Sequence, residues 1–170
     1  MSFLLDTSVL AELRKPRPSP AVVAWYSGVA DAELFLSVLV VGEIQQGVTR
    51  LRRRDPRQAA VYEAWLGKLR REFGDRVLPV SQDVAQAWGR LAAGDPLPVV
   101  DGLLAATALV HGLTMVTRNV ADFEPTGVAL LDPFEGGATA SAAPLAAGTR
   151  RAGRPRRGGR EPPPGRRRPS

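Results

Sequence analysis

The sequence predicts an α/β protein with a mostly parallel sheet that helices cover on both faces. The first reason is that short apolar runs alternate along the chain with longer segments of helical periodicity, the pattern of βαβ units. The second is size: the part up to residue 134 has the length of a single domain with its own core. In such sheets, ligands bind beyond the carboxyl ends of the strands.

Each predicted element follows from apolar periodicity and from the residues that end it. The apolar runs predict strands at residues 4–5, 34–38, 76–80, 113–117 and 128–131. Helical spacing predicts helices over residues 8–15, 21–29, 39–54, 57–73, 81–92 and 99–111. Pro16 stops the first helix, Ser81 caps the fifth and Gly112 ends the last, while residues 94–98 form a turn before it.

Residues 135–170 differ from the rest of the chain and are predicted to be a disordered tail. Of these 36 residues, 29 are Gly, Ala, Pro or Arg, and nine Arg stand against two Glu. Such a segment buries too little apolar surface to offset the entropy of ordering. The predicted domains are therefore a folded unit over 1–134 and a tail over 135–170, and the net charge of +6 belongs to the tail.

Composition excludes several kinds of active site. The chain has no Cys and a single histidine, His111, so neither a thiolate metal site nor a paired-imidazole nuclease can be built. We expect His111 to serve the end of its helix. No P-loop, nucleophile elbow or dinucleotide-binding glycine motif occurs. Neither a signal peptide nor a membrane span is predicted, so we expect a soluble cytoplasmic protein.

Three carboxylates lie in apolar surroundings without a basic partner nearby in the sequence: Asp6, Glu43 and Asp101. Burying an unpaired carboxylate costs on the order of several kcal/mol. A parallel sheet would gather these positions at one edge, where their mutual repulsion would be relieved by a divalent cation. Oxygen ligands without His or Cys favour Mg²⁺ or Mn²⁺. Asp122 is the fourth candidate, with Glu124 as its rival.

Structural roles are the alternative for each of these residues. Asp6 and Asp101 could be helix N-caps, and Glu43 could pair with a distant arginine. Short polar side chains near the acids could orient carboxylates or waters, or could simply form turns and caps: Thr7, Ser8, Thr117 and Asn119. For Ser8 the cap is the preferred interpretation.

Metal-assisted phosphodiester hydrolysis is the chemistry that such a cluster favours, because bound Mg²⁺ activates water and stabilises the leaving oxygen. An aspartyl-phosphate phosphatase is disfavoured, since Ser8 occupies the position where that chemistry needs a second Asp. Arginines cluster near the end of the helix over 39–54, namely Arg50, Arg52, Arg53, Arg54 and Arg57. They form either a solvated face or a contact for RNA phosphates or a partner.

Four segments resemble the motifs of PIN-domain ribonucleases, and more closely those of VapC toxins in the FitB-like branch. They are FLLDTSVL at 3–10, LSVLVVGEI at 36–44, PVVDGLLAATA at 98–108 and VTRNVADF at 116–123. The resemblance implies a three-layer α/β/α fold, a Mg²⁺- or Mn²⁺-dependent endoribonuclease of a toxin–antitoxin system, and usually a homodimer. It also implies a VapB-like antitoxin whose C-terminal segment occludes the active site.

The resemblance further implies roles for individual residues. Asp6 and Asp101 would be direct metal ligands, and Glu43 and Asp122 would bind directly or through water. Two features depart from the family pattern: the loop at 94–98 is short, and the tail has no counterpart. A non-catalytic PIN-like module that binds RNA or a partner is the alternative function.

Overall fold

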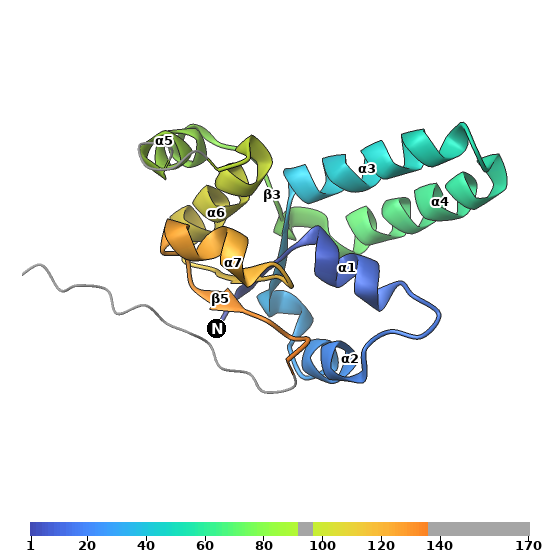
Figure 1. The fold of residues 1–170 in the computed structure, drawn as a ribbon, viewed down its shortest axis with the longest axis horizontal. Helices are drawn as coiled ribbons and strands as arrows, with labels where there is room; N and C mark the ends of the chain where they lie inside the picture. The colour runs from blue at the N-terminus through green and yellow to red at the C-terminus, as the bar shows by residue number, and fades with distance from the viewer. Residues whose placement is uncertain (92–96, 136–170) are drawn as a thin grey trace, which may run out of the picture.

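The computed structural model describes residues 1–91 and 97–135, and five parallel strands form the sheet at its centre (Figure 1). The strands are β1 (Phe3–Leu5), β2 (Leu34–Ser37), β3 (Val77–Leu78), β4 (Thr114–Val116) and β5 (Leu130–Leu131). Their order is β3-β2-β1-β4-β5, and every pairing is parallel. β1 therefore lies in the middle, between β2 and β4.

Helices flank this sheet, and together with the parallel strands they confirm the predicted α/β fold class. The α-helices are α1 (Thr7–Leu13), α2 (Pro20–Ser27), α3 (Val38–Arg52), α4 (Pro56–Phe73), α5 (Gln82–Leu91), α6 (Val99–His111) and α7 (Val120–Phe123). Short 3-10 turns are η1 (Asp31–Glu33), η2 (Gly74–Arg76) and η3 (Glu124–Thr126). Figure 1 shows α3 and α4 side by side as a hairpin that extends away from the strands. Within the described ranges, no helix is both long and apolar enough to cross a membrane.

The observed elements agree with the predicted ones in order and type, with two differences. Four strands are shorter than predicted, for example β2, which ends at Ser37 because α3 begins at Val38, whereas β1 is one residue longer. The helix α7 was not predicted, since its four residues are too few to show a period. The turn at 94–98 lies largely outside the described residues, and so does the tail beyond Glu135.

The core forms where the central strands are covered on both faces. Leu4, Leu5 and Leu36 have no exposed surface, and neither do Met115 and Val116 of β4. Continuous burial of this kind is typical of parallel strands between helical layers. The strands are therefore a rigid base for the segments that follow them.

A close approach between α5 and α6 fixes the helix that carries Asp101. A Cβ atom on Gly102 would lie 2.8 Å from the ring of Trp88, so only glycine allows the indole to lie against α6 at this point. Gly112, with a φ of 63°, ends α6 in the left-handed conformation, as the sequence predicted.

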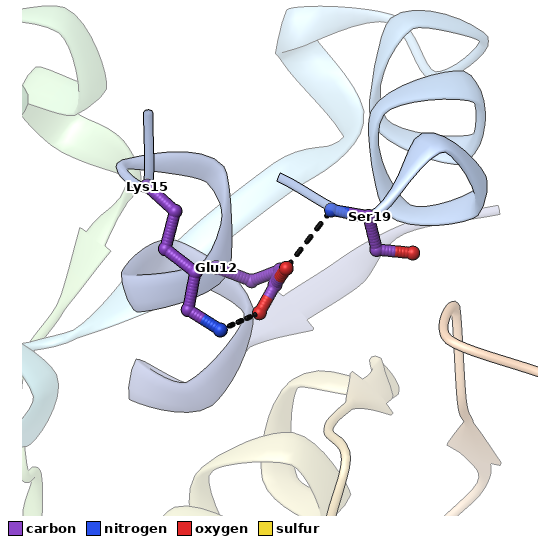
Figure 2. Close-up of polar contacts among 3 residues, drawn as sticks. All are labelled: Glu12, Lys15 and Ser19. Carbon is purple, nitrogen blue, oxygen red and sulfur yellow. Dashed lines mark hydrogen bonds and ion pairs between the residues drawn. The ribbon is translucent and has the colours of Figure 1, made fainter. Parts of the chain in front are cut away.

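One buried acid, Glu12 on α1, has an evident structural role. Its carboxylate accepts hydrogen bonds from Lys15 Nζ at 2.5 Å and from the backbone nitrogen of Ser19 at 2.9 Å (Figure 2). The Lys15 hydrogen bond, followed by that from Ser19, holds the pKa of Glu12 below its ordinary value. The side chain thus ties the end of α1 to the start of α2.

We predict that Glu12→Gln lowers the melting temperature at neutral pH. Because the folded-state pKa of Glu12 is depressed, the ionised carboxylate stabilises the fold above its ordinary pKa, about 4.3, and this contribution is lost as pH falls through the folded value. The difference between wild type and variant should therefore shrink in acid, measured by thermal denaturation across pH. Glu72→Gln is the matched control, since Glu72 forms only an exposed pair with Lys68 and should change little. A pH-independent difference would contradict the prediction.

Candidate active site

Three of the four candidate acids come from segments that follow strands at the same edge of the sheet, and the fourth, Asp101, comes from the helix that leads into β4. Asp6 directly follows β1, and Glu43 lies on α3, which begins directly after β2. Asp122 lies on α7, shortly after β4, while Asp101 is in the first turn of α6, which leads into β4. Parallel strands bring their carboxyl ends to one edge, and these segments start there.

Asp6 is the most rigidly held of these acids. Its side chain is 8% exposed, and its Oδ1 accepts a hydrogen bond from the backbone nitrogen of Thr7 at 2.7 Å. Its Oδ2 accepts from Ser8 Oγ at 2.7 Å and from Thr117 Oγ1 at 2.8 Å. Asp6 is the N-cap of α1, as the structural alternative for this residue predicted. Three donors from two segments nevertheless exceed what capping one helix requires.

Thr7 connects Asp6 to Glu43. The Thr7 hydroxyl donates to Glu43 Oε2 at 2.5 Å, while the Thr7 backbone nitrogen donates to Asp6. One residue therefore holds carboxylates from α1 and α3 in a fixed relation. Glu43 is half-buried, and its Oε2 accepts the hydrogen bond from Thr7.

The pKa of Asp101 is affected by the charges of the other three acids. Burial is the first cause that raises its pKa, and the negative charges of Asp6, Glu43 and Asp122 raise it further. The rival Glu124 is not among these causes, which favours Asp122 as the fourth member of the group. The N-cap interpretation of Asp101 is wrong, because Pro98 occupies that position and Asp101 lies inside the helix.

None of the ion pairs formed among residues 1–91 and 97–135 involves any of these four acids. Glu12 provides the contrast: it is as buried as Asp6, but a lysine compensates its charge and its pKa is lowered. The pKa of Asp101 moves in the opposite direction, because burial raises it and its charged neighbours are acids that raise it further. The site is therefore an uncompensated concentration of negative charge.

The donor atoms fit a hard divalent cation that keeps part of its water shell. In the described part of the chain, no group of three or more acidic, His or Cys side chains is placed so that it could hold a metal ion. Mg²⁺ retains several waters and usually takes roughly one or two protein carboxylates together with substrate phosphates. A set of carboxylates suits such an ion better than it suits zinc, whose protein ligands are mainly Cys and His.

The hydroxyl groups around the acids have roles that the sequence indicated only in part. The helix-cap interpretation of Ser8 is wrong, because its hydroxyl donates to Asp6 and accepts from the Arg118 backbone nitrogen at 3.3 Å. Thr117 is fully buried and receives a hydrogen bond from the backbone nitrogen of Asn119 at 3.0 Å. Asn119 itself precedes α7 with an exposed side chain. The order Asp6, Thr7, Ser8 was the signal for this network, since all three side chains bond within it.

The arginine cluster divides into two groups. Arg50, Arg53 and Arg54 line a hollow of about 580 Å³ at the end of α3. Arg52 instead pairs with Glu63 of α4 at 2.6 Å and so connects the two helices of the hairpin. Arg57 is exposed and does not line this hollow.

Comparisons with known proteins agree with this fold. The PIN domain family matches residues 3–124. The chain is 31% identical to a VapC ribonuclease, Y4jK, of Sinorhizobium fredii over 78% of its own length and 98% of that protein. It is also 31% identical to toxin FitB of Neisseria gonorrhoeae, with the same coverage of both proteins. The crystal structure of FitAcB from Neisseria gonorrhoeae superposes with a TM-score of 0.72 over 78% of this chain and 98% of that one, at 31% identity.

We predict that Asp101→Asn stabilises the metal-free protein at neutral pH. Because the folded-state pKa is raised, the ionised carboxyl disfavours the fold, and this penalty declines as pH falls below the folded value and is gone below the ordinary pKa of an Asp. The melting temperature in EDTA should rise by up to about 3 °C, a small change because solvent screens a partly exposed group. The difference should vanish in acid. Asp83→Asn, in the first turn of α5, is the control, and it should not raise the melting temperature at any pH.

Proposed function

This chain belongs to the PIN-domain family and, within it, to the VapC toxins, and on that premise we propose that it is a Mg²⁺- or Mn²⁺-dependent endoribonuclease. The observation that carries the proposal is that Thr7 joins Asp6 to Glu43 by hydrogen bonds while neither acid enters an ion pair in the described residues. Burial raises the pKa of the nearby Asp101, and the charges of Asp6, Glu43 and Asp122 raise it further. A fold that only needed helix caps would have no reason to concentrate negative charge at one place. A protein that binds a divalent cation there has one.

Asp6 and Asp101 would hold the ion, and Glu43 and Asp122 would contact it directly or through its waters. When bound, the ion would activate a water molecule and stabilise the oxygen that leaves the phosphorus. The hydroxyls of Ser8 and Thr117 keep Oδ2 of Asp6 in one orientation, and Thr7 does the same for Glu43. Such partners orient metal ligands before binding, which lowers the cost of binding.

We predict that Asp6→Asn abolishes RNA cleavage without unfolding the protein. Loss of an orienting partner alone typically costs about 10–100-fold in metal affinity or activity, so loss of a ligand should cost at least about 100-fold. The measurement is cleavage of single-stranded RNA in Mg²⁺ or Mn²⁺, with circular dichroism as the check on folding. Asp83→Asn should cleave like wild type. If the folded Asp6→Asn protein cleaved RNA at the same rate as wild type, the nuclease mechanism would be refuted.

The second candidate function, a non-catalytic module that binds RNA or a partner, differs in its response to metal. We predict that Mg²⁺ or Mn²⁺ raises the melting temperature of wild type relative to EDTA, because a ligand that binds only the folded state stabilises it. The effect should disappear in Asp101→Asn and persist in Asp83→Asn. A melting temperature that is indifferent to metal would support the module instead.

We also propose a VapB-like antitoxin as partner and a homodimer as the assembly. The structural relatives at 30% identity or more support the first, since they are the structures of FitAcB from Neisseria gonorrhoeae and of FitAB bound to a DNA fragment. Co-expression with the product of an adjacent small gene should yield a complex that copurifies and does not cleave RNA. Light scattering of the free protein tests the homodimer.

A further inference from the structure

Two adjoining hollows run from Glu43, one of the proposed catalytic acids, along α3 to its arginine-rich end. A groove of about 390 Å³ is lined by Thr7 and Glu43 of the site and, farther along, by Tyr62 and Trp65 of α4. Gly47 and Leu51 line this groove and also the hollow formed by the arginines, so the two are contiguous. Glu43, Gly47 and Leu51 are four residues apart and therefore share one face of α3.

The middle of this track presents flat apolar and cationic surfaces. The guanidinium carbon of Arg14 lies 3.1 Å from the centre of the Tyr62 ring and 5.4 Å from that of Trp65. Arg14 takes part in no ion pair within the described ranges, and its guanidinium lies over both aromatic rings. Aromatic rings and arginine planes are the surfaces on which unpaired bases stack.

The far end of the track presents positive charge that nothing in the described structure neutralises. Arg50, Arg53 and Arg54 are exposed and belong to none of the ion pairs there. Arg52 faces Glu63 and lies outside the hollow. Three free guanidinium groups at one end of a groove match the spaced phosphates of a nucleic acid strand.

We infer that this track binds the single-stranded RNA that flanks the cleaved bond. A base stacks against Arg14, Tyr62 and Trp65, and the phosphates beyond it contact Arg50, Arg53 and Arg54. An apolar peptide would use the groove but leave the three arginines unpaired, and a free phosphate would use the arginines but not the groove. The inference rests on the proposed function, because it takes RNA as the substrate of the adjacent acids.

Binding without cleavage tests the track. The probe is a short fluorescein-labelled single-stranded RNA, and its affinity for the full chain is measured by anisotropy in EDTA, in an Asp6→Asn background. Tyr62→Leu should weaken binding by about 5- to 100-fold through lost stacking. Replacing Arg50, Arg53 and Arg54 with Gln should reduce the slope of log affinity against log salt by about 2, since each single-strand phosphate contact contributes about 0.7. Arg52→Gln is the matched control and should leave the slope unchanged.

A set of RNAs with one abasic nucleotide at each position separates stacking from misfolding. At one position, removal of the base should weaken RNA binding by the protein that retains Tyr62. The same abasic RNA should bind to the Tyr62→Leu variant no more weakly than the intact RNA does. Unchanged affinity in Tyr62→Leu together with an unchanged salt slope in the triple variant would overturn the inference. The inference would also be overturned if these variants still bound RNA but no longer copurified with an antitoxin, because the track would then bind a protein. If the acids prove non-catalytic while these variants still lose RNA, the proposed nuclease fails and the track stands.

Discussion

Parallel pairing of β1 with both β2 and β4 makes the segments after these strands begin at one edge of the sheet. Asp6 and Glu43 reach the site because α1 and α3 start at that edge, and Thr117 reaches Asp6 because β4 ends there. The backbone nitrogen of Asp6 donates to Val116 at 3.0 Å, so the ladder itself continues into the site. The fully buried leucines of β1 fix this geometry, since they cannot shift register without exposing the core.

Two buried acids on one short helix show how burial alone fails to identify function. Glu12 and Asp6 are almost equally hidden, at 7% and 8% exposure. Glu12 is satisfied by a cation and a backbone donor, and it connects α1 to α2. Asp6 receives hydrogen bonds from neutral donors and contributes to the raised pKa of Asp101, and no basic side chain among the described residues pairs with it. The sign of the surrounding charge, rather than the depth of burial, separates a structural acid from a candidate ligand.

The hairpin of α3 and α4 links the site to a surface that extends away from the sheet (Figure 1). α3 carries Glu43 near its start and the arginines at its end, so one helix runs from negative to positive charge. The bridge between Arg52 and Glu63 holds α4 in place, and α4 supplies Tyr62 and Trp65 to the groove. Under the proposed function, the acids would serve the reacting phosphate of an RNA strand and the arginines its other phosphates.

The sequence by itself determined the fold class, the order of the elements and the identity of the unusual acids. These depend on local information: apolar periodicity, prolines and glycines that end helices, and carboxylates inside apolar segments. Only the tertiary structure decided that Ser8 bonds to Asp6 rather than capping a helix, that Asp101 lies within α6, and that Asp122 rather than Glu124 acts on it. It also separated Arg52 from its neighbours and placed Arg14 against Tyr62. Each of these depends on which remote side chain occupies the adjacent space, and that follows from how strands and helices pack rather than from spacing along the chain.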